Sequence, residues 1–178
     1  MLAAGGSHWR QNLDLNVASA VRLDRHVVPL TVAQGHGSVV HISSGAALHP
    51  ARGDGIPYAA AKAALNVYSK GLANEVGPSG VRVVAVPPGL VESESSLTAM
   101  QEVADHRGIT VDELRAYLYE HWVGPLGRPG RGEEAPELIA FLASSRSSYL
   151  TGTQIAVDGR DPPGALTPGR SKKKKERT

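Results

Sequence analysis

Residues 81–86 read Val81-Arg82-Val83-Val84-Ala85-Val86, a nearly continuous apolar run that stops at Pro87-Pro88-Gly89. Such a run is typical of a parallel strand that is covered on both faces. A second strand is indicated by Ser38-Val39-Val40-His41-Ile42-Ser43, which is rich in β-branched residues. Near the C-terminus, Thr153-Gln154-Ile155-Ala156-Val157 predicts a third, short strand.

Helical patterns separate these strands. Apolar residues recur at helical spacing from Trp9 to about Ala33, and Thr110 with Glu113 forms a capping box that opens another helix. Together the patterns predict helices over residues 9–33, 58–76, 94–105, 110–122 and 133–143. Strands that alternate with helices imply right-handed crossovers and a parallel sheet. The pattern alone therefore predicts an α/β fold.

The composition is that of an ordinary soluble globular protein. The chain has 178 residues and no cysteine, which excludes disulfides, thiolate nucleophiles and cysteine-ligated zinc. No apolar run reaches the roughly 18 residues that a membrane span needs, and the N-terminus does not have the pattern of a signal peptide. We therefore expect a single domain over residues 1–160, without a bound metal, in the cytoplasm and away from membranes.

The basic residues are concentrated at the C-terminus. Residues 170–178 hold six Lys or Arg against one Glu, so the rest of the chain is net acidic although the overall charge is +2. The sequence pI of about 9.0 therefore reflects a tail and not a basic surface of the fold. Residues 161–178, rich in Pro, Gly and Lys, are expected to be disordered. Nucleic-acid binding has little support, because no basic or aromatic pattern extends into the fold.

Tyr58 and Lys62 form a Tyr-x-x-x-Lys pair at the start of the helix over residues 58–76. A spacing of four places both side chains on one helix face, one turn apart. A phenol is a poor general base at neutral pH, because its reference pKa is about 10, but a nearby ammonium and the positive helix N-terminus both favour the phenolate. Without further context, such a pair is more often an ordinary surface pair than a catalytic one.

The surrounding pattern gives this pair a chemical setting. Ser43-Ser44 ends a strand, and Ser44 lies 14 residues before Tyr58, at the carboxyl edge where α/β sheets place their ligands. A serine hydroxyl there would donate to a substrate carbonyl oxygen beside the tyrosine. The strand at 81–86 ends at the same edge in Pro88-Gly89-Leu90-Val91-Glu92-Ser93. Two strand ends and one helix N-terminus are therefore expected to converge.

These motifs resemble those of the short-chain dehydrogenase/reductase family. The resemblance is carried, in family order and at near-family spacing, by Asn16-Val17, Ile42-Ser43-Ser44, Tyr58-Ala59-Ala60-Ala61-Lys62, Val81-Arg82-Val83 and Pro88-Gly89-Leu90-Val91. Segments at 126–129, 139–144 and 149–152 are also similar, so the likeness covers roughly residues 7–160. It implies a partial Rossmann-like, doubly wound parallel sheet with flanking helices.

The resemblance also implies an oxidoreductase that transfers hydride between NAD or NADP and a carbonyl or alcohol. Tyr58 would be the general acid/base, and Lys62 would favour its phenolate and bond the nicotinamide ribose. Ser44 would polarise the carbonyl, and Asn16 would hold a water of the proton relay. The cofactor would be contacted by Tyr58, Lys62, Pro88, Gly89, Val91 and Ser93, with Ser93 where the family commonly has threonine.

One family feature is missing from the sequence: the N-terminal strand-turn-helix whose glycine-rich loop binds the dinucleotide. Residues 1–8 are too few to supply it, so the chain is expected to be the C-terminal catalytic portion of a family member. Gly130-Arg131-Gly132-Glu133-Glu134-Ala135 matches a relaxed glycine-rich pattern, but its two glutamates stand where a pyrophosphate would dock, and we reject it as a cofactor loop. The alternative function is a truncated, catalytically impaired remnant that at most associates with other subunits.

The partners expected from the resemblance are a small carbonyl or alcohol substrate and further copies of the chain. The substrate's identity stays open, because the segment 92–125 that covers it in the family mixes polar and aromatic residues. The choice between NAD and NADP lies in the absent half. The helices over 9–33 and 58–76 are the family's usual subunit interface. Without the missing strands, apolar faces at 38–43 and 81–86 are expected to be exposed.

Overall fold

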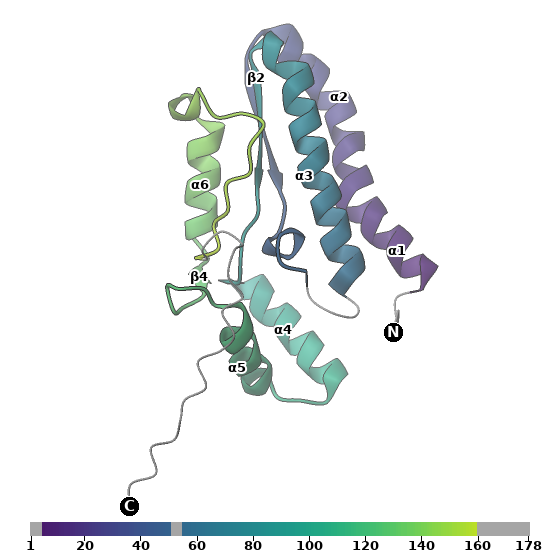
Figure 1. Cartoon of the computed structure of the whole chain (residues 1–178), viewed down its shortest axis with the longest axis vertical. Coiled ribbons are helices and arrows are strands. Elements are labelled where there is room, and N and C mark those ends of the chain that lie inside the picture. The colour runs from purple at the N-terminus through teal and green to yellow at the C-terminus, as the bar shows by residue number, and fades with distance from the viewer. Residues whose placement is uncertain (1–4, 51–54, 160–178) are drawn as a thin grey trace, which may run out of the picture.

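The computed structural model of this chain describes residues 5–50 and 55–159, which excludes the predicted tail at 161–178. Its centre is a parallel pair of strands, β1 (Gly37–Ile42) and β2 (Val81–Val86), in register from Gly37 opposite Val81 to Ile42 opposite Val86. Helices cover both faces of this pair (Figure 1). The α/β class and the parallel arrangement that the sequence predicts are confirmed.

The predicted third strand at 153–157 is only partly formed. This segment runs parallel to β2 but makes two isolated bridges, Gln154 with Ala85 and Val157 with Pro88. The amide of Val157 donates to the carbonyl of Pro87 at 3.2 Å, but Pro87 has no N–H to return. The ladder is therefore interrupted where a regular strand would continue.

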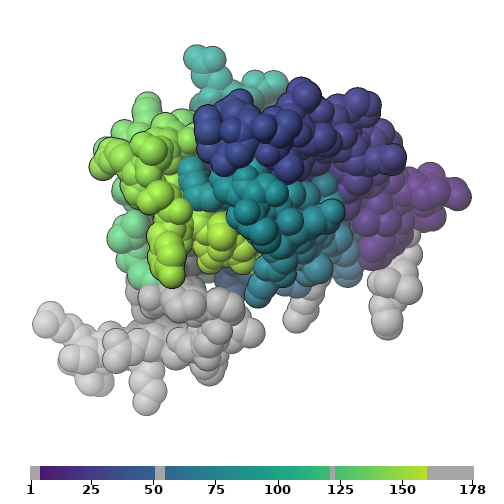
Figure 2. All heavy atoms as spheres, turned by 90° about the horizontal axis from the view of Figure 1, so that it is seen from above, coloured from purple at the N-terminus to yellow at the C-terminus, as the bar shows by residue number. Residues whose placement is uncertain are grey.

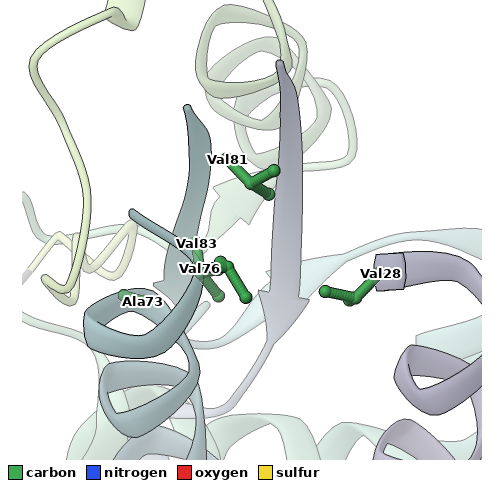
Figure 3. Packing of buried hydrophobic residues seen from close by; sticks show 5 residues of the cluster. All are labelled: Val28, Ala73, Val76, Val81 and Val83. Atoms are coloured by element: carbon green, nitrogen blue, oxygen red, sulfur yellow. The ribbon is translucent and has the colours of Figure 1, made fainter. Parts of the chain in front are cut away.

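One face of the sheet is covered by two long helical segments. The first is continuous and consists of α1 (Gly6–Leu13), the π-helical turn η1 (Asp14–Ala18) and α2 (Ser19–Gln34). The second is α3 (Ile56–Val76), which extends the predicted helix by two residues at its start. Figure 3 shows the core between them and the strands, where the buried residues are Val28, Ala73, Val76, Val81 and Val83.

The other face is covered by α6 (Glu134–Ala143), which packs through Leu142 on Val84 and Val86. Arg82 explains the one charge in the β2 run. Its guanidinium donates to the carbonyls of Leu142 and Ser144, both at 3.0 Å, and so binds the carboxyl end of α6. Figure 2 shows the N-terminal helices and the C-terminal segment on opposite sides of the molecule.

The remaining elements lie beyond the carboxyl ends of the strands. They are α4 (Glu94–Arg107), α5 (Val111–Trp122) and a two-residue parallel ladder of β3 (Val91–Glu92) with β4 (Gly130–Arg131). The predicted capping box is present, since Glu113 N–H donates to Thr110 Oγ1 at 3.2 Å and Thr110 N–H to the Glu113 carboxylate at 2.8 Å. The helices meet at Met100, Ala104 and Leu114. The sequence did not predict the β3–β4 pair.

The two main strands differ in burial. Val83, Val84 and Val86 of β2 are fully buried, because β1 and the segment 153–157 flank this strand while α3 and α6 cover it. The expectation that residues 81–86 would be exposed is therefore wrong. On β1, Ile42 is 43% exposed and the two valines are half-buried. None of the described helices is long and apolar enough to cross a membrane.

Candidate active site

The candidate site lies at the carboxyl ends of β1 and β2, which stay joined beyond the sheet. The amide of Ser43 donates to the carbonyl of Val86 at 2.8 Å, and the amide of Gly45 donates to the carbonyl of Pro88 at 2.7 Å. These two bonds place Ser44 beside the turn that follows β2. The predicted convergence of the two strand ends is therefore present in the structure.

Tyr58 and Lys62 lie on the first turns of α3, which begins at Ile56 with Pro57 in the position that suits a helix start. The Lys62 ammonium donates to the carbonyl of Ile42 at 2.9 Å and lies 5.8 Å from the centre of the Tyr58 ring. Burial lowers the pKa of Lys62 from its usual range. The Tyr58 side chain is 37% exposed, so a ligand can reach it. The Lys62 side chain is thus bonded to the end of β1.

Ser44 has extended backbone angles and begins the short 3-10 turn η2 (Gly45–Ala47). Its Oγ accepts a hydrogen bond from the amide of Ala46 at 3.1 Å. This bond uses a lone pair of the oxygen and leaves the hydroxyl hydrogen for another acceptor. Ser44 also lines a pocket of about 200 Å³, whose walls are Ser44, Gly45, Ala46, Pro88, Gly89, Leu90, Leu118 and Asp158.

Asn16 lies in the π-helical turn η1, and its side chain is half-buried. Its amide donates to the carbonyl of Asn12 at 3.0 Å, within the same helical segment. The turn itself packs against α3. Single π-helical turns are frequent at functional sites. The structure thus brings Asn16 to the helix that carries Tyr58 and Lys62, without a direct hydrogen bond to either among the described residues.

The predicted cofactor-binding residues after β2 fall into two groups. Pro88 and Gly89 line the pocket beside Ser44. Gly89 is required by packing, since a Cβ at this position would lie 2.6 Å from the Cβ of Asp158. Val91 belongs to β3, and Ser93 is the N-cap of α4, where its Oγ accepts from the amide of Ser96 at 3.2 Å. Neither residue lines the pocket, so the structure brings only the first group directly to Ser44.

Five pocket residues and a nearby cluster were not identified as site residues from the sequence; three of the five, Gly45, Ala46 and Leu90, are neighbours of predicted ones. Leu118 of α5 and Asp158 complete the pocket, and both are distant in sequence from the motifs. Beside them, the carboxylate of Glu92 accepts hydrogen bonds from Arg115 and from the hydroxyl of Tyr119. The Tyr119 bond, and then the Arg115 bond, hold the pKa of Glu92 below its usual range. This cluster ties α5 to the segment that follows Pro88-Gly89.

In the glycine-rich segment at 130–132, the backbone amide of Arg131 already binds a carboxylate. The carboxylate of Glu134 accepts from the amide of Arg131 at 2.7 Å and from both terminal nitrogens of Arg128, at 2.9 and 2.7 Å. The Arg128 contact and the Arg131 amide lower the pKa of Glu134 to about 2. An anionic pyrophosphate would have to displace this carboxylate, which supports the rejection of the segment as a cofactor loop.

Comparison with known proteins places this geometry in context. Residues 1–159 match a family model described as enoyl-(acyl carrier protein) reductase. Sorbitol-6-phosphate 2-dehydrogenase of Klebsiella pneumoniae is 34% identical over 153 residues, which are 85% of this chain and 57% of that protein. A 3-oxoacyl-acyl-carrier-protein reductase of Thermotoga maritima is 34% identical over 151 residues, 85% of this chain and 56% of that protein.

Solved structures agree with the sequence relatives. L-sorbose reductase from Gluconobacter frateurii, complexed with NADPH and L-sorbose, superimposes with a TM-score of 0.77 at 32% identity, over 92% of this chain and 61% of that chain. A 3-oxoacyl-acyl-carrier-protein reductase from Brucella melitensis with bound NAD has a TM-score of 0.69 at 26% identity, over 88% of this chain and 52% of that one. The chain thus spans about half the length of the relatives that it matches. Within that span, sequence and structure agree that the protein belongs to the short-chain dehydrogenase/reductase family.

Proposed function

We propose that this chain carries the catalytic apparatus of an NAD(P)-dependent oxidoreductase that interconverts a carbonyl compound and an alcohol. The observation that carries the proposal is the Lys62 ammonium, which is bonded to the Ile42 carbonyl at the end of β1 and faces the Tyr58 ring. Ser44 lies two residues after Ile42 and lines the pocket, whereas Tyr58 and Lys62 are not among its lining residues. A hydroxyl donor, a phenol and an ammonium at one sheet edge are the groups that proton transfer to a carbonyl oxygen requires.

Each residue has a distinct role in this proposal. Ser44 donates its hydroxyl hydrogen to the substrate carbonyl oxygen and orients it. Tyr58 gives a proton to that oxygen during reduction and takes it back during oxidation. Lys62 stabilises the phenolate that Tyr58 becomes, because an ammonium favours a nearby anion. Asn16, on the turn that packs against α3, holds a water through which the proton is replaced.

The residues around the pocket fit the nicotinamide end of a dinucleotide. Lys62 gives one of its three ammonium hydrogens to Ile42 and has the others for a ribose hydroxyl. Pro88 and Gly89 present a wall without long side chains. Val91 and Ser93 follow them in the chain and would contact the cofactor beyond the pocket. NAD or NADP bound there would supply or accept the hydride. The similar L-sorbose reductase is complexed with NADPH and the Brucella melitensis reductase with NAD, so both cofactors stay candidates.

The alternative function is an impaired family member that associates with other subunits, and an exposed apolar face gives it a basis. Leu15, Leu23 and Leu30 are 64–69% exposed on η1 and α2, and Val67 of α3 is 74% exposed. Leu15, Leu23 and Leu30 recur at helical spacing, and exposed apolar patches favour an interface. We propose a homo-oligomer through these two helices, with or without catalysis. The cytoplasmic location expected above also stays a proposal.

Cofactor binding separates the two functions. The purified chain is mixed with NADH or NADPH, and fluorescence of the nicotinamide and thermal stability of the protein are followed. Binding in the micromolar range supports the enzyme, and no binding at millimolar cofactor contradicts it for this chain. Tyr58→Phe is expected to abolish turnover of a carbonyl substrate and to leave cofactor binding largely unchanged.

Analytical ultracentrifugation of Leu23→Glu tests the proposed subunit interface. The expected result is dissociation of the oligomer.

A further inference from the structure

A buried polar cluster lies outside the pocket, between β1 and the two long helices. Asp24 of α2 and His41 of β1 are both 7% exposed. One carboxylate oxygen of Asp24 accepts two hydrogen bonds, from Nε2 of His41 at 3.0 Å and from the hydroxyl of Tyr68 at 2.9 Å. Tyr68 belongs to α3. A single buried oxygen therefore joins α2, β1 and α3, the last of which carries Tyr58 and Lys62.

The hydrogen-bonding roles in the cluster are set by its chemistry. The Tyr68 pKa is raised, first by burial and then by the Asp24 hydrogen bond, so this phenol keeps its proton and donates it. A carboxylate can only accept, so His41 must carry its hydrogen on Nε2. Nδ1 of His41 is buried and has no hydrogen-bond partner within the described ranges.

Three consecutive residues at the end of β1 contact α3 through polar groups. His41 reaches Tyr68 through Asp24, Ile42 accepts from the Lys62 ammonium, and the hydroxyl of Ser43 donates to the backbone carbonyl of Lys62 at 3.3 Å. Lys62 and Tyr68 are less than two helical turns apart on α3. The Asp24–His41–Tyr68 hydrogen bonds thus fix the same alignment of β1 against α3 that places Lys62 at the Ile42 carbonyl.

We propose that Asp24 is a positioning residue for the reaction proposed above. Its carboxylate fixes β1 against α3, and this holds the Lys62 ammonium at the Ile42 carbonyl, where it faces Tyr58. Asp24 touches neither substrate nor cofactor and acts only through Lys62. The inference rests on the proposed function for its catalytic meaning, but the coupling of Asp24 to Lys62 is a property of the chain alone.

Burying the Asp24 carboxylate is energetically less favourable than filling the same space with apolar side chains. Removing an ion from water remains costly even after relaxation, and well-packed apolar residues often stabilise a fold as well or better. Such groups are best explained where they specify one arrangement among several. Here the arrangement is the strand-helix register at the candidate site, which an apolar contact, being non-directional, would specify less sharply.

The test measures the environment of Lys62 without substrate or cofactor. The rate of amine labelling at Lys62 is followed by mass spectrometry across a pH series, and the midpoint of the profile reports its pKa whatever the accessibility. In Asp24→Ala the midpoint is expected to rise by about half a unit or more towards that of a solvated lysine, an amount within the ordinary spread for lysines in folded proteins. Asp24→Asn keeps an acceptor oxygen and is expected to restore most of the original midpoint.

Two further variants make the result decisive. Asp14→Ala removes an exposed carboxylate that binds Arg22 on the same helical segment, and is expected to leave the midpoint unchanged. Tyr68→Phe removes one donor without a charge and takes the place of Asp24→Ala if that variant does not fold. A lower melting temperature with an unshifted Lys62 midpoint in the folded variants would overturn the proposal, because it is the signature of a purely structural role. Turnover is not part of this readout, so a chain without turnover counts against the proposed function and not against the coupling.

Discussion

The ammonium nitrogen of Lys62 lies 5.8 Å from the centre of the Tyr58 ring, one helical turn further along the same face of α3. The local spacing of four residues explains why the two side chains share a face. It does not explain the direction of the lysine, which is set by a carbonyl twenty residues earlier, that of Ile42. The position of the Lys62 ammonium therefore depends on the end of β1 as well as on the spacing within α3.

Replacing the lysine tests whether its ammonium is needed for turnover. Lys62→Met keeps a side chain of similar length but loses the ammonium and its bond to Ile42. Turnover of a carbonyl substrate with NADPH is expected to fall by about 10²-fold or more, the usual range for general acid/base catalysis. Steady-state kinetics measures this effect. Lys70→Met, on the exposed side of α3, is the matched control and should retain activity. Equal losses in both variants would point to a general defect of the helix.

Ser44 serves both the local backbone and the proposed reaction. Ser44→Ala loses the hydrogen bond from the Ala46 amide, and is expected to cost about 1 kcal/mol of unfolding free energy, as for other capping hydroxyls. It should also lower kcat. Ser44→Thr keeps the hydroxyl on an extended backbone that suits a β-branched residue, and should recover much of kcat. If kcat survives in Ser44→Ala, Ser44 is only a cap.

The contrast between local and non-local features explains what the sequence could predict. Helical spacing and the Thr110–Glu113 box depend on neighbours in the chain, and they place α3 and α5 to within two residues. The strand at 153–157 is interrupted because of Pro87, which follows β2, and the pattern within residues 153–157 cannot indicate a proline in another segment. The π-helical turn at Asn16 could not be predicted from the sequence either, because the apolar residues on both sides of it keep a helical spacing.

The candidate site divides in the same way. Ser44, Tyr58, Lys62, Pro88 and Gly89 were identified from motifs, and strand-end chemistry explains why they meet. Leu118 and Asp158 reach the pocket from segments whose placement follows from tertiary packing. The buried cluster of Asp24, His41 and Tyr68 was not identified, since its members lie 17 and 44 residues apart along the hydrogen bonds that join them. No local pattern relates residues at such distances.

Gly89 offers a test of the close packing behind the pocket. A methyl group at this position would lie 2.6 Å from the Cβ and 2.7 Å from the Cα of Asp158, so one of the two segments must move. Gly89→Ala is expected to lower the unfolding free energy by about 1–3 kcal/mol, as other overpacked sites do. Urea denaturation measures it. The matched control is Gly71→Ala in α3, where nothing lies within 4 Å, and it should stabilise the chain by up to about 1 kcal/mol.

Glu134 predicts how stability changes in acid. Its pKa of about 2 lies below the ordinary value of 4.5, because Arg128 and the Arg131 amide bond its ionised form. A group whose pKa is depressed in the folded state contributes stability above the unfolded value and loses it as the pH falls. The contribution is therefore present above about pH 4.5 and disappears between there and pH 2.

Glu134→Gln should remove that part of the pH dependence. Thermal melting between pH 2 and pH 6 is expected to show a shallower acid slope in this variant than in the unchanged chain, and the two curves should converge near pH 2. Glu137→Gln, an exposed glutamate of the same helix, is the control and should keep the original slope. Added salt should reduce the difference, because the Arg128 contact is partly open to solvent. Parallel curves across the whole range would contradict a lowered pKa of Glu134 in the folded chain.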